Sequence, residues 1–176
     1  MRYLKIYAHN LYPDKWPDVV YLEFYDDIPA PGTLIKKATA FEISLDGKLD
    51  WVIADDMNGD GVEDKQDDDL AIELAQIFLK FNWYSLVEPF DKYLKAFVED
   101  YDADGKPDTV RLHFHQGDGE PRDETLAYTA ALYKNGDGSG EGTTINHDVN
   151  NDTKNDAVDS ALVKEFSEYF LKFSWY

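Results

Sequence analysis

The chain contains no cysteine and only three arginines among its 176 residues. Without cysteine it can form neither a disulfide nor a thiolate metal site. The N-terminal residues, Met-Arg-Tyr-Leu-Lys-Ile-Tyr, include no long apolar stretch, so we expect neither a signal peptide nor a membrane span. These absences predict a cytoplasmic protein, or a secreted or cell-surface protein if a leader has been removed.

Positive charge is also scarce, because 17 Lys and Arg residues face 36 Asp and Glu residues, giving a net charge of −19. Such a chain cannot neutralise phosphates, which excludes nucleic acid as an expected partner. Adaptation to high salt and mimicry of DNA would each explain the acidity. The basic residues are mostly lysine, however, and many carboxylates gather in compact loops. Both features favour a protein that concentrates cations.

The segment from Asp56 to Asp67, here called loop one, carries the most specific pattern. Oxygen-bearing side chains occupy loop positions 1, 3, 5, 9 and 12, and Gly61 occupies position 6. Calcium prefers six to eight oxygen ligands, and a glycine at position 6 allows the sharp turn that directs short carboxylates inward. The expected ligands, with the main-chain carbonyl at position 7, are Asp56, Asn58, Asp60, Val62, Asp64 and Asp67.

Loop one resembles the calcium loops of EF-hand and dockerin-type sequences, which implies a calcium site. The resemblance covers the loop and the helix that follows it. The family has a helix before the loop, whereas Trp51 to Ala54 predicts a strand, and position 12 is Asp67 where glutamate is usual. The alternative is an Asx-rich turn that caps the next helix without metal.

Two further segments repeat parts of this pattern. Loop three, Asp148 to Asp159, keeps all five side-chain positions but has Thr153 in place of glycine; its expected ligands are Asp148, Asn150, Asp152, Lys154 through its carbonyl, Asp156 and Asp159. Loop two, Asp100 to Asp108, resembles the shorter calcium loops of integrin-type propellers; its expected ligands are Asp100, Asp102, Asp104, Lys106 through its carbonyl and Asp108. We therefore expect two to three calcium sites.

The sequence also repeats internally, with an offset of 90 residues that becomes 92 after a glycine-rich insertion. Leu79-Lys-Phe81 and Leu171-Lys-Phe173 are one matched pair. Each half predicts about four strands followed by an amphipathic helix, over 70–81 and 158–173. The expected fold is therefore α+β, with two tandem repeats, 1–84 and 85–176, each of four antiparallel strands plus one helix, packed together. The segment matched to loop two, Asn10 to Asp18, has Tyr12 in place of a carboxylate, so we expect a lost site there.

No nucleophile elbow, phosphate loop or assignable pair of catalytic carboxylates is present, so we expect no enzyme. His113 and His115 should lie on the solvent side of a strand, without a third ligand for zinc. Trp83 and Trp175 should pack in the core, with a sugar-binding platform as the alternative. The sequence predicts a calcium-binding protein, either a sensor or buffer or a calcium-stabilised structural module. The alternative is a calcium-dependent adhesion or carbohydrate-binding module.

Overall fold

A computed structural model of the whole chain describes residues 1–11, 16–28, 32–44, 46–86, 91–101, 103, 105, 107–117, 125–134, 141–144 and 147–176. Its elements, in chain order, are β1 (Arg2–His9), β2 (Val19–Asp26), β3 (Thr33–Phe41), β4 (Trp51–Ala54), α1 (Lys65–Leu79), β5 (Lys92–Glu99), β6 (Thr109–Gln116), β7 (Leu126–Lys134), β8 (Glu141–Thr144), α2 (Ala157–Phe170) and a 3-10 turn, η2 (Leu171–Phe173). Helix α1 begins at Lys65, several residues before the expected range of 70–81, whereas α2 begins at Ala157, next to the expected start at 158.

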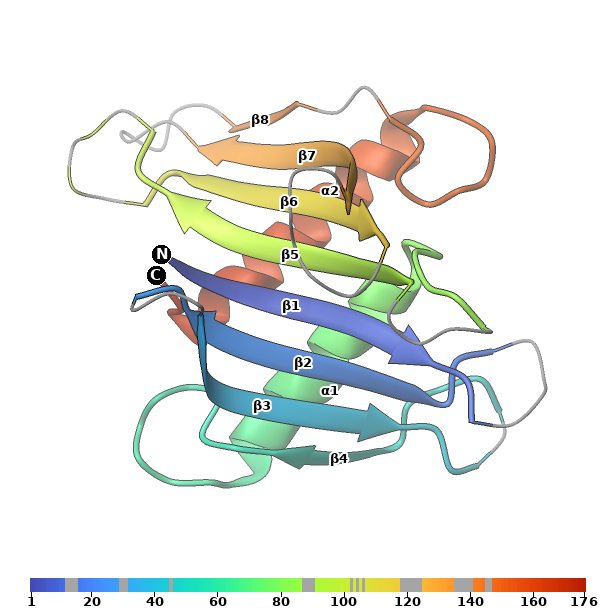
Figure 1. Cartoon of the computed structure of the whole chain (residues 1–176), viewed down its shortest axis with the longest axis vertical. Helices are drawn as coiled ribbons and strands as arrows, with labels where there is room; N and C mark the ends of the chain where they lie inside the picture. The colour runs from blue at the N-terminus through green and yellow to red at the C-terminus, as the bar shows by residue number, and fades with distance from the viewer. Residues whose placement is uncertain are drawn as a thin grey trace.

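All eight strands belong to one antiparallel sheet, in the order β4-β3-β2-β1-β5-β6-β7-β8 (Figure 1). The two central strands join the halves of the chain, because Leu4, Lys5 and Ile6 of β1 pair with Ala96, Lys95 and Leu94 of β5. The predicted fold of two tandem units, each with its own four-stranded sheet and helix, packed together, is therefore wrong. Hydrogen bonding between β1 and β5 removes two sheet edges that separate units would leave unpaired.

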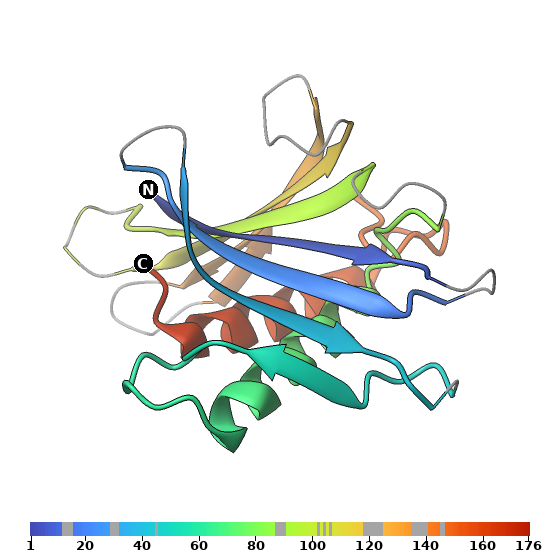
Figure 2. The same ribbon diagram turned by 60° about the horizontal axis from the view of Figure 1, so that its bottom comes forward.

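Both helices cover the same face of this sheet (Figures 1 and 2). Alternation along each strand sends every second side chain to that face, as Leu4, Ile6 and Ala8 of β1 illustrate. Phe81, just after α1, contacts Phe114 of β6 and Phe166 of α2, with ring centroids 5.3 and 5.4 Å apart. The helices thus share one apolar core with strands from both halves of the sheet.

No described helix lies on the other face of the sheet, where pairs of aromatic rings stack. Tyr3 stacks on Tyr25 and Tyr7 stacks on Tyr21, with centroids 5.1 and 4.9 Å apart. The Glu23 carboxylate accepts hydrogen bonds from the Tyr7 and Tyr25 hydroxyls, at 3.0 and 2.9 Å. These contacts let large aromatic side chains lie on this face with little exposed area.

The acidic loops lie at the edges of this layered structure. Loop one connects β4 to α1 and loop three connects β8 to α2, so the two lie at opposite corners of the sheet (Figure 1). Loop two connects β5 to β6. In the part of the chain that the structure describes, no helix combines the length and the apolar character needed to cross a bilayer.

Candidate functional site

Loop one is a tight turn in which acidic side chains point inward to the backbone. The Asp56 carboxylate accepts hydrogen bonds from the N–H groups of Gly59, Asp60 and Gly61, at 2.7, 3.2 and 2.8 Å. The Asn58 amide oxygen also accepts from Asp60, at 2.8 Å, and the Asp60 carboxylate accepts from Val62 N–H at 2.9 Å. The side chains at positions 1, 3 and 5 therefore converge on the same short stretch of backbone.

Asp67, at position 12, ties the loop to the helix from inside. Its side chain is only 1% exposed, and its carboxylate accepts from the N–H groups of Met57, Asn58 and Asp64 at 2.7, 3.0 and 2.9 Å. Burial raises the pKa of Asp67, but these hydrogen bonds and the nearby Lys36 outweigh burial, so the pKa lies below its ordinary value. Asp64 completes a capping box at the start of α1.

Loop three reproduces this hydrogen bonding. The Asp148 carboxylate accepts from the N–H groups of Asp152 and Thr153 at 3.0 and 2.6 Å, and the Asp152 carboxylate accepts from Lys154 N–H at 2.9 Å. Asp159 is fully buried, accepts from Val149, Asn150 and Asp156, and forms the capping box of α2 with Asp156. The two loops therefore share one architecture at opposite corners of the sheet.

The three loops also share an unusual backbone conformation. Positions 4 and 6 have positive φ in every loop: Gly59 and Gly61 at 77° and 87°, Ala103 and Gly105 at 59° and 86°, and Asn151 and Thr153 at 56° and 75°. Positive φ is easy for glycine and tolerated by asparagine, but it is costly for alanine and for β-branched threonine. The loops therefore adopt positive φ at these positions even where the residue is one for which positive φ is unfavourable.

Only part of loop two can be placed, because Asp102, Asp104 and Lys106 lie outside the described residues. Its Asp100 carboxylate accepts from Gly105 N–H at 2.8 Å, which is the bond from position 1 to position 6 that loops one and three also form. Asp108 is buried and accepts from Tyr101 N–H at 3.0 Å. In the matched segment of the first half, Asp18 accepts in the same way from Leu11, while Tyr12 and Asp14 lie outside the described residues.

Among the described residues, no group of three His, Asp or Glu side chains is arranged to hold a metal ion. Like charges repel, and backbone N–H groups satisfy the carboxylates separately. Positions 1, 3 and 5 are brought close together in loops one and three, whereas position 9 accepts from a helix N–H group and position 12 accepts from N–H groups of the loop itself. The side chain of Val62 faces solvent, as does that of Lys154, and only their carbonyls were predicted to bind metal.

Sequence reasoning missed Lys36, which lies behind loop one. Its ammonium donates a 2.6 Å hydrogen bond to the Met57 carbonyl and lies over the rings of Phe24 and Trp175, at 5.2 and 5.1 Å. Burial lowers the pKa of Lys36, while Asp56 and Asp67 oppose that shift. Nothing in the spacing of β3 identified this lysine, because its proximity to the loop depends on how strand and loop pack.

Tyr128 takes the corresponding place behind loop three. It pairs with Phe114 in the sheet as Lys36 pairs with Phe24, and it stacks on Phe114 with centroids 4.4 Å apart. Burial raises the pKa of Tyr128, and the charges of Asp148 and Asp159 raise it further, so the hydroxyl stays neutral. Loop one therefore packs against a cation, Lys36, whereas loop three packs against the neutral side chain of Tyr128.

Trp83 and Trp175 are buried, and their indole N–H groups donate to backbone carbonyls of Tyr93, His115 and Tyr3. They are core residues and cannot form a sugar platform. The prediction for His115 is wrong, because this side chain is 3% exposed, stacks on Tyr93 and contacts the Thr125 hydroxyl at 2.9 Å. The contact between Thr125 and His115 could not be predicted from the alternation of residues in β6.

Comparison with protein-family models, with curated proteins and with solved structures found no match to this chain.

Proposed function

We propose that the chain is a calcium-binding protein in which loops one and three hold one calcium ion each and loop two provides a third site. The ions would stabilise the junctions between the sheet and the two helices. The main support is the backbone shape shared by the three loops, which is kept at Ala103, Asn151 and Thr153 despite their side chains. A non-glycine residue at positive φ costs about 1–2 kcal/mol, and such strain persists where the surroundings demand one conformation.

The chemistry of the loops suits calcium. At positions 1, 3 and 5, Asp56, Asn58 and Asp60 present hard oxygen atoms from one short segment. A carboxylate has about four lone-pair sites, so accepting backbone hydrogen bonds leaves capacity for a cation. Magnesium demands a tighter octahedron and keeps its waters, so flexible acidic loops should favour calcium.

The arrangement favours a structural role over a sensor role. A sensor changes the angle of a helix when calcium binds. Here the capping boxes of Asp64 and Asp156 already fix the first turn of each helix, and the buried Asp67 and Asp159 tie each loop to that turn. Calcium at positions 1, 3 and 5 would therefore stiffen a junction whose direction is set.

A second function, calcium-dependent carbohydrate binding, is favoured by one observation. Trp16 and Tyr84 line a pocket beside Asn82, whose amide donates a 2.7 Å hydrogen bond to the Asn150 carbonyl of loop three. The structure thus has an aromatic pocket next to a proposed metal site, which the adhesion alternative requires.

Calorimetric titration with calcium tests the main proposal. We expect two or three ions per chain. Asp60→Asn should lower the calcium affinity of loop one at least tenfold, because it removes the negative charge of one ligand. Glu63→Gln is the matched control, since it removes one exposed charge from position 8 of the same loop without removing a ligand; its effect should stay below about threefold, as expected for exposed charges in water. No heat at millimolar calcium, or equal binding of magnesium, would contradict the proposal.

A further inference from the structure

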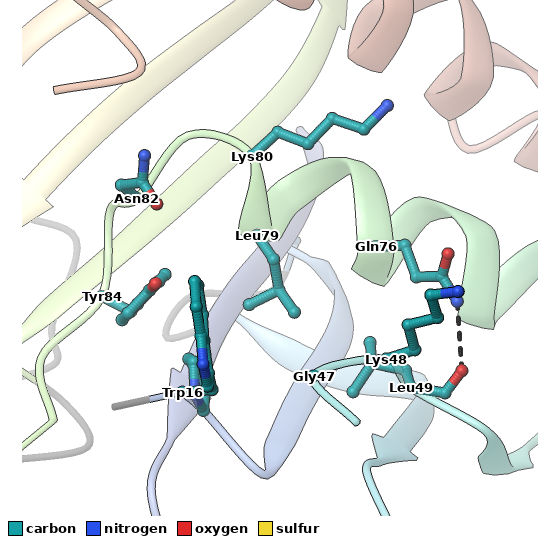
Figure 3. A pocket seen from close by; sticks show the side chains of 10 residues that line it. Trp16, Gly47, Lys48, Leu49, Gln76, Leu79, Lys80, Asn82 and Tyr84 are labelled. Atoms are coloured by element: carbon teal, nitrogen blue, oxygen red, sulfur yellow. Dashed lines mark hydrogen bonds between the residues drawn. The ribbon is translucent and has the colours of Figure 1, made fainter. Parts of the chain in front are cut away.

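A pocket of about 310 Å³ lies where the C-terminal end of α1 meets the turn between β3 and β4 (Figure 3). The described residues that line it are Trp16, Pro17, Gly47, Lys48, Leu49, Gln76, Leu79, Lys80, Asn82 and Tyr84. Its size is at the lower end of the range for small-molecule sites, which is about 300–1,000 Å³. It could accommodate a single sugar ring or a ligand of similar size.

The apolar part of the pocket combines a buried floor with an accessible aromatic side. Pro17 and Leu49 are buried, whereas the Trp16 side chain is 57% exposed. In the view of Figure 3, Trp16 and Tyr84 lie to one side of Leu79, and Gln76 and Lys48 lie to the other. Burial raises the pKa of Tyr84, so its hydroxyl stays protonated and can donate a hydrogen bond. An exposed tryptophan with a half-buried tyrosine suits a ligand that has an apolar face and polar edges.

The polar part of the pocket is basic, although the protein is acidic. Two of its described lining residues, Lys48 and Lys80, are cations and none is an acid, in a chain with 36 Asp and Glu residues. Lys80 pairs with Glu165 at 2.5 Å, which leaves Lys48 as the cation whose described side chain has no acidic partner. The Gln76 amide N–H group donates to the Leu49 carbonyl at 3.1 Å, which fixes the side chain. The pocket therefore suits a ligand with one negative charge and several hydroxyl groups.

Some residues of the second half that match the pocket lining lie among the described residues. Pro107 and Leu171, which match Pro17 and Leu79 at the sequence offsets, line a cavity of only about 10 Å³. Glu168 stands where Gln76 stands and forms an ion pair with Lys134 at 3.5 Å.

We infer that this pocket binds a carboxylated pyranose, such as a uronate or sialate residue of an oligosaccharide. The CH-rich face of the ring would stack on Trp16, the hydroxyl groups would bond to Gln76 and Asn82, and the carboxylate would pair with Lys48. Charge favours an anionic ligand, since the Lys48 ammonium has no acidic partner among the described residues and no described lining residue is an acid.

The pocket is also connected to loop three. Asn82 donates to the Asn150 carbonyl at 2.7 Å, and Asn151 donates to the Phe81 carbonyl at 3.1 Å, so loop and helix end hold each other through two hydrogen bonds. Calcium in loop three would stiffen Asn150 and Asn151 and thereby fix Asn82 within the pocket. The sugar site deepens the second proposed function, carbohydrate binding, and this coupling rests in addition on calcium in loop three.

An array of uronate- and sialate-containing oligosaccharides, with their neutral counterparts, tests the site. We expect the wild-type chain to bind carboxylated members, and Trp16→Ala to lose at least tenfold in affinity. Trp51→Ala is the matched control, because Trp51 is 49% exposed on β4 and lies outside the pocket. Lys48→Gln should abolish the preference for carboxylated members over neutral ones. No binding to the array, unchanged binding by Trp16→Ala or equal binding of neutral members would overturn the inference.

Repeating the array in calcium and in EGTA tests the coupling. Wild-type affinity should fall at least threefold in EGTA. Asn151→Gly keeps a residue suited to positive φ but removes the side chain that donates to Phe81, so its binding should depend less on calcium. Calorimetry on the same samples separates the two hypotheses. Absence of calcium binding would refute the calcium proposal and leave the sugar site standing. If calcium binds but the affinity for oligosaccharide is the same in calcium and in EGTA, only the coupling is refuted.

Discussion

Loops one and three share most of their hydrogen bonds but have different residues at their most constrained positions. Loop one has Gly59 and Gly61 at positive φ, whereas loop three has Asn151 and Thr153. Behind loop one lies the ammonium of Lys36, and behind loop three lies the neutral hydroxyl of Tyr128. Loop one therefore has the easier backbone and the less favourable electrostatic surroundings for a cation, and loop three has the reverse.

This comparison shows that a ligand pattern alone does not rank two sites. From sequence alone, loop one would be expected to bind calcium more tightly than loop three, because it has glycine at position 6. The ammonium of Lys36 would oppose a divalent ion at Asp56, however, and this effect grows where water is excluded. The two loops can therefore have similar affinities for different reasons.

Removing calcium should have the largest effect, and it should affect both corners of the sheet. If the proposal holds, each ion would stabilise the fold by about 2.7 kcal/mol at a hundredfold excess over its Kd, a large share of a total of roughly 5–15 kcal/mol. Chelation should lower the melting temperature, and hydrogen exchange should rise together near 70–81 and 162–173. An increase in exchange at one helix only would show that the loop before the other helix keeps its conformation without metal. An unchanged melting curve would identify both loops as ordinary acidic turns.

Asp67→Ala and Asp159→Ala should each lower the free energy of unfolding by about 3 kcal/mol, because each leaves several buried N–H groups without an acceptor. Urea denaturation in EGTA would measure this. Asp60→Ala, at exposed position 5, is the control and should cost less than about 1 kcal/mol. A clear difference between the two buried positions would break the equivalence of the loops.

The stabilisation by Asp67 should also depend on pH in a defined direction. Its pKa in the folded state lies below the ordinary value of 3.8, so its contribution is complete above that value and is lost as pH falls through the folded-state pKa. The stability gap between the wild type and Asp67→Asn should therefore narrow in acid. A gap that widens on acidification would contradict this assignment.

Lys36→Met should raise the calcium affinity of loop one by about tenfold, equivalent to about 1.4 kcal/mol. The substitution keeps much of the apolar contact with Phe24 and Trp175 while removing the charge beside Asp56. Lys37→Met is the matched control, since Lys37 is exposed and its side chain alternates to the other face of β3. Calorimetry should show no change in loop three. Equal effects of the two variants would show that the charge of Lys36 does not specifically weaken calcium binding at loop one.

Thr153→Gly should have the smallest effect, an increase of about 1 kcal/mol in stability, because glycine relieves the strain of positive φ. The reciprocal change, Gly61→Thr, should cost a similar amount. A Cβ on Gly61 would meet no atom within 4 Å, so that variant tests backbone strain alone. Chemical denaturation in EGTA measures both, and a destabilised Thr153→Gly would show that the threonine side chain makes a contribution of its own.

Much of the local structure was predictable because it depends on residues close together in sequence. The strand predicted at Trp51 to Ala54 is β4, and apolar spacing predicted the C-terminal part of α1 and nearly all of α2. The start of α1 was missed because Lys65 to Asp69 are all polar, and the capping box of Asp64 and Asp67 begins the helix there. The ligand spacing of loop one was visible for the same local reason.

The assembly was not predictable from those patterns. The pairing of β1 with β5 merges the strands into one sheet, and it depends on an interaction between residues about 90 positions apart. Sequence alternation specifies which face of a strand is apolar, but it does not specify which strand lies beside it. This is why the prediction of two packed units failed while the individual strands were recognised.

The sequence by itself determined the charge, the absence of thiol chemistry, the positions of most strands and helices, and the spacing of oxygen ligands in the loops. Only the tertiary structure decided that Asp67 and Asp159 are buried against backbone N–H groups, that Lys36 and Tyr128 lie behind the two loops, and that Trp16 meets Tyr84 in a pocket. Spacing along the chain controls local turns, whereas burial and electrostatic surroundings arise from elements that are distant in sequence and close in space.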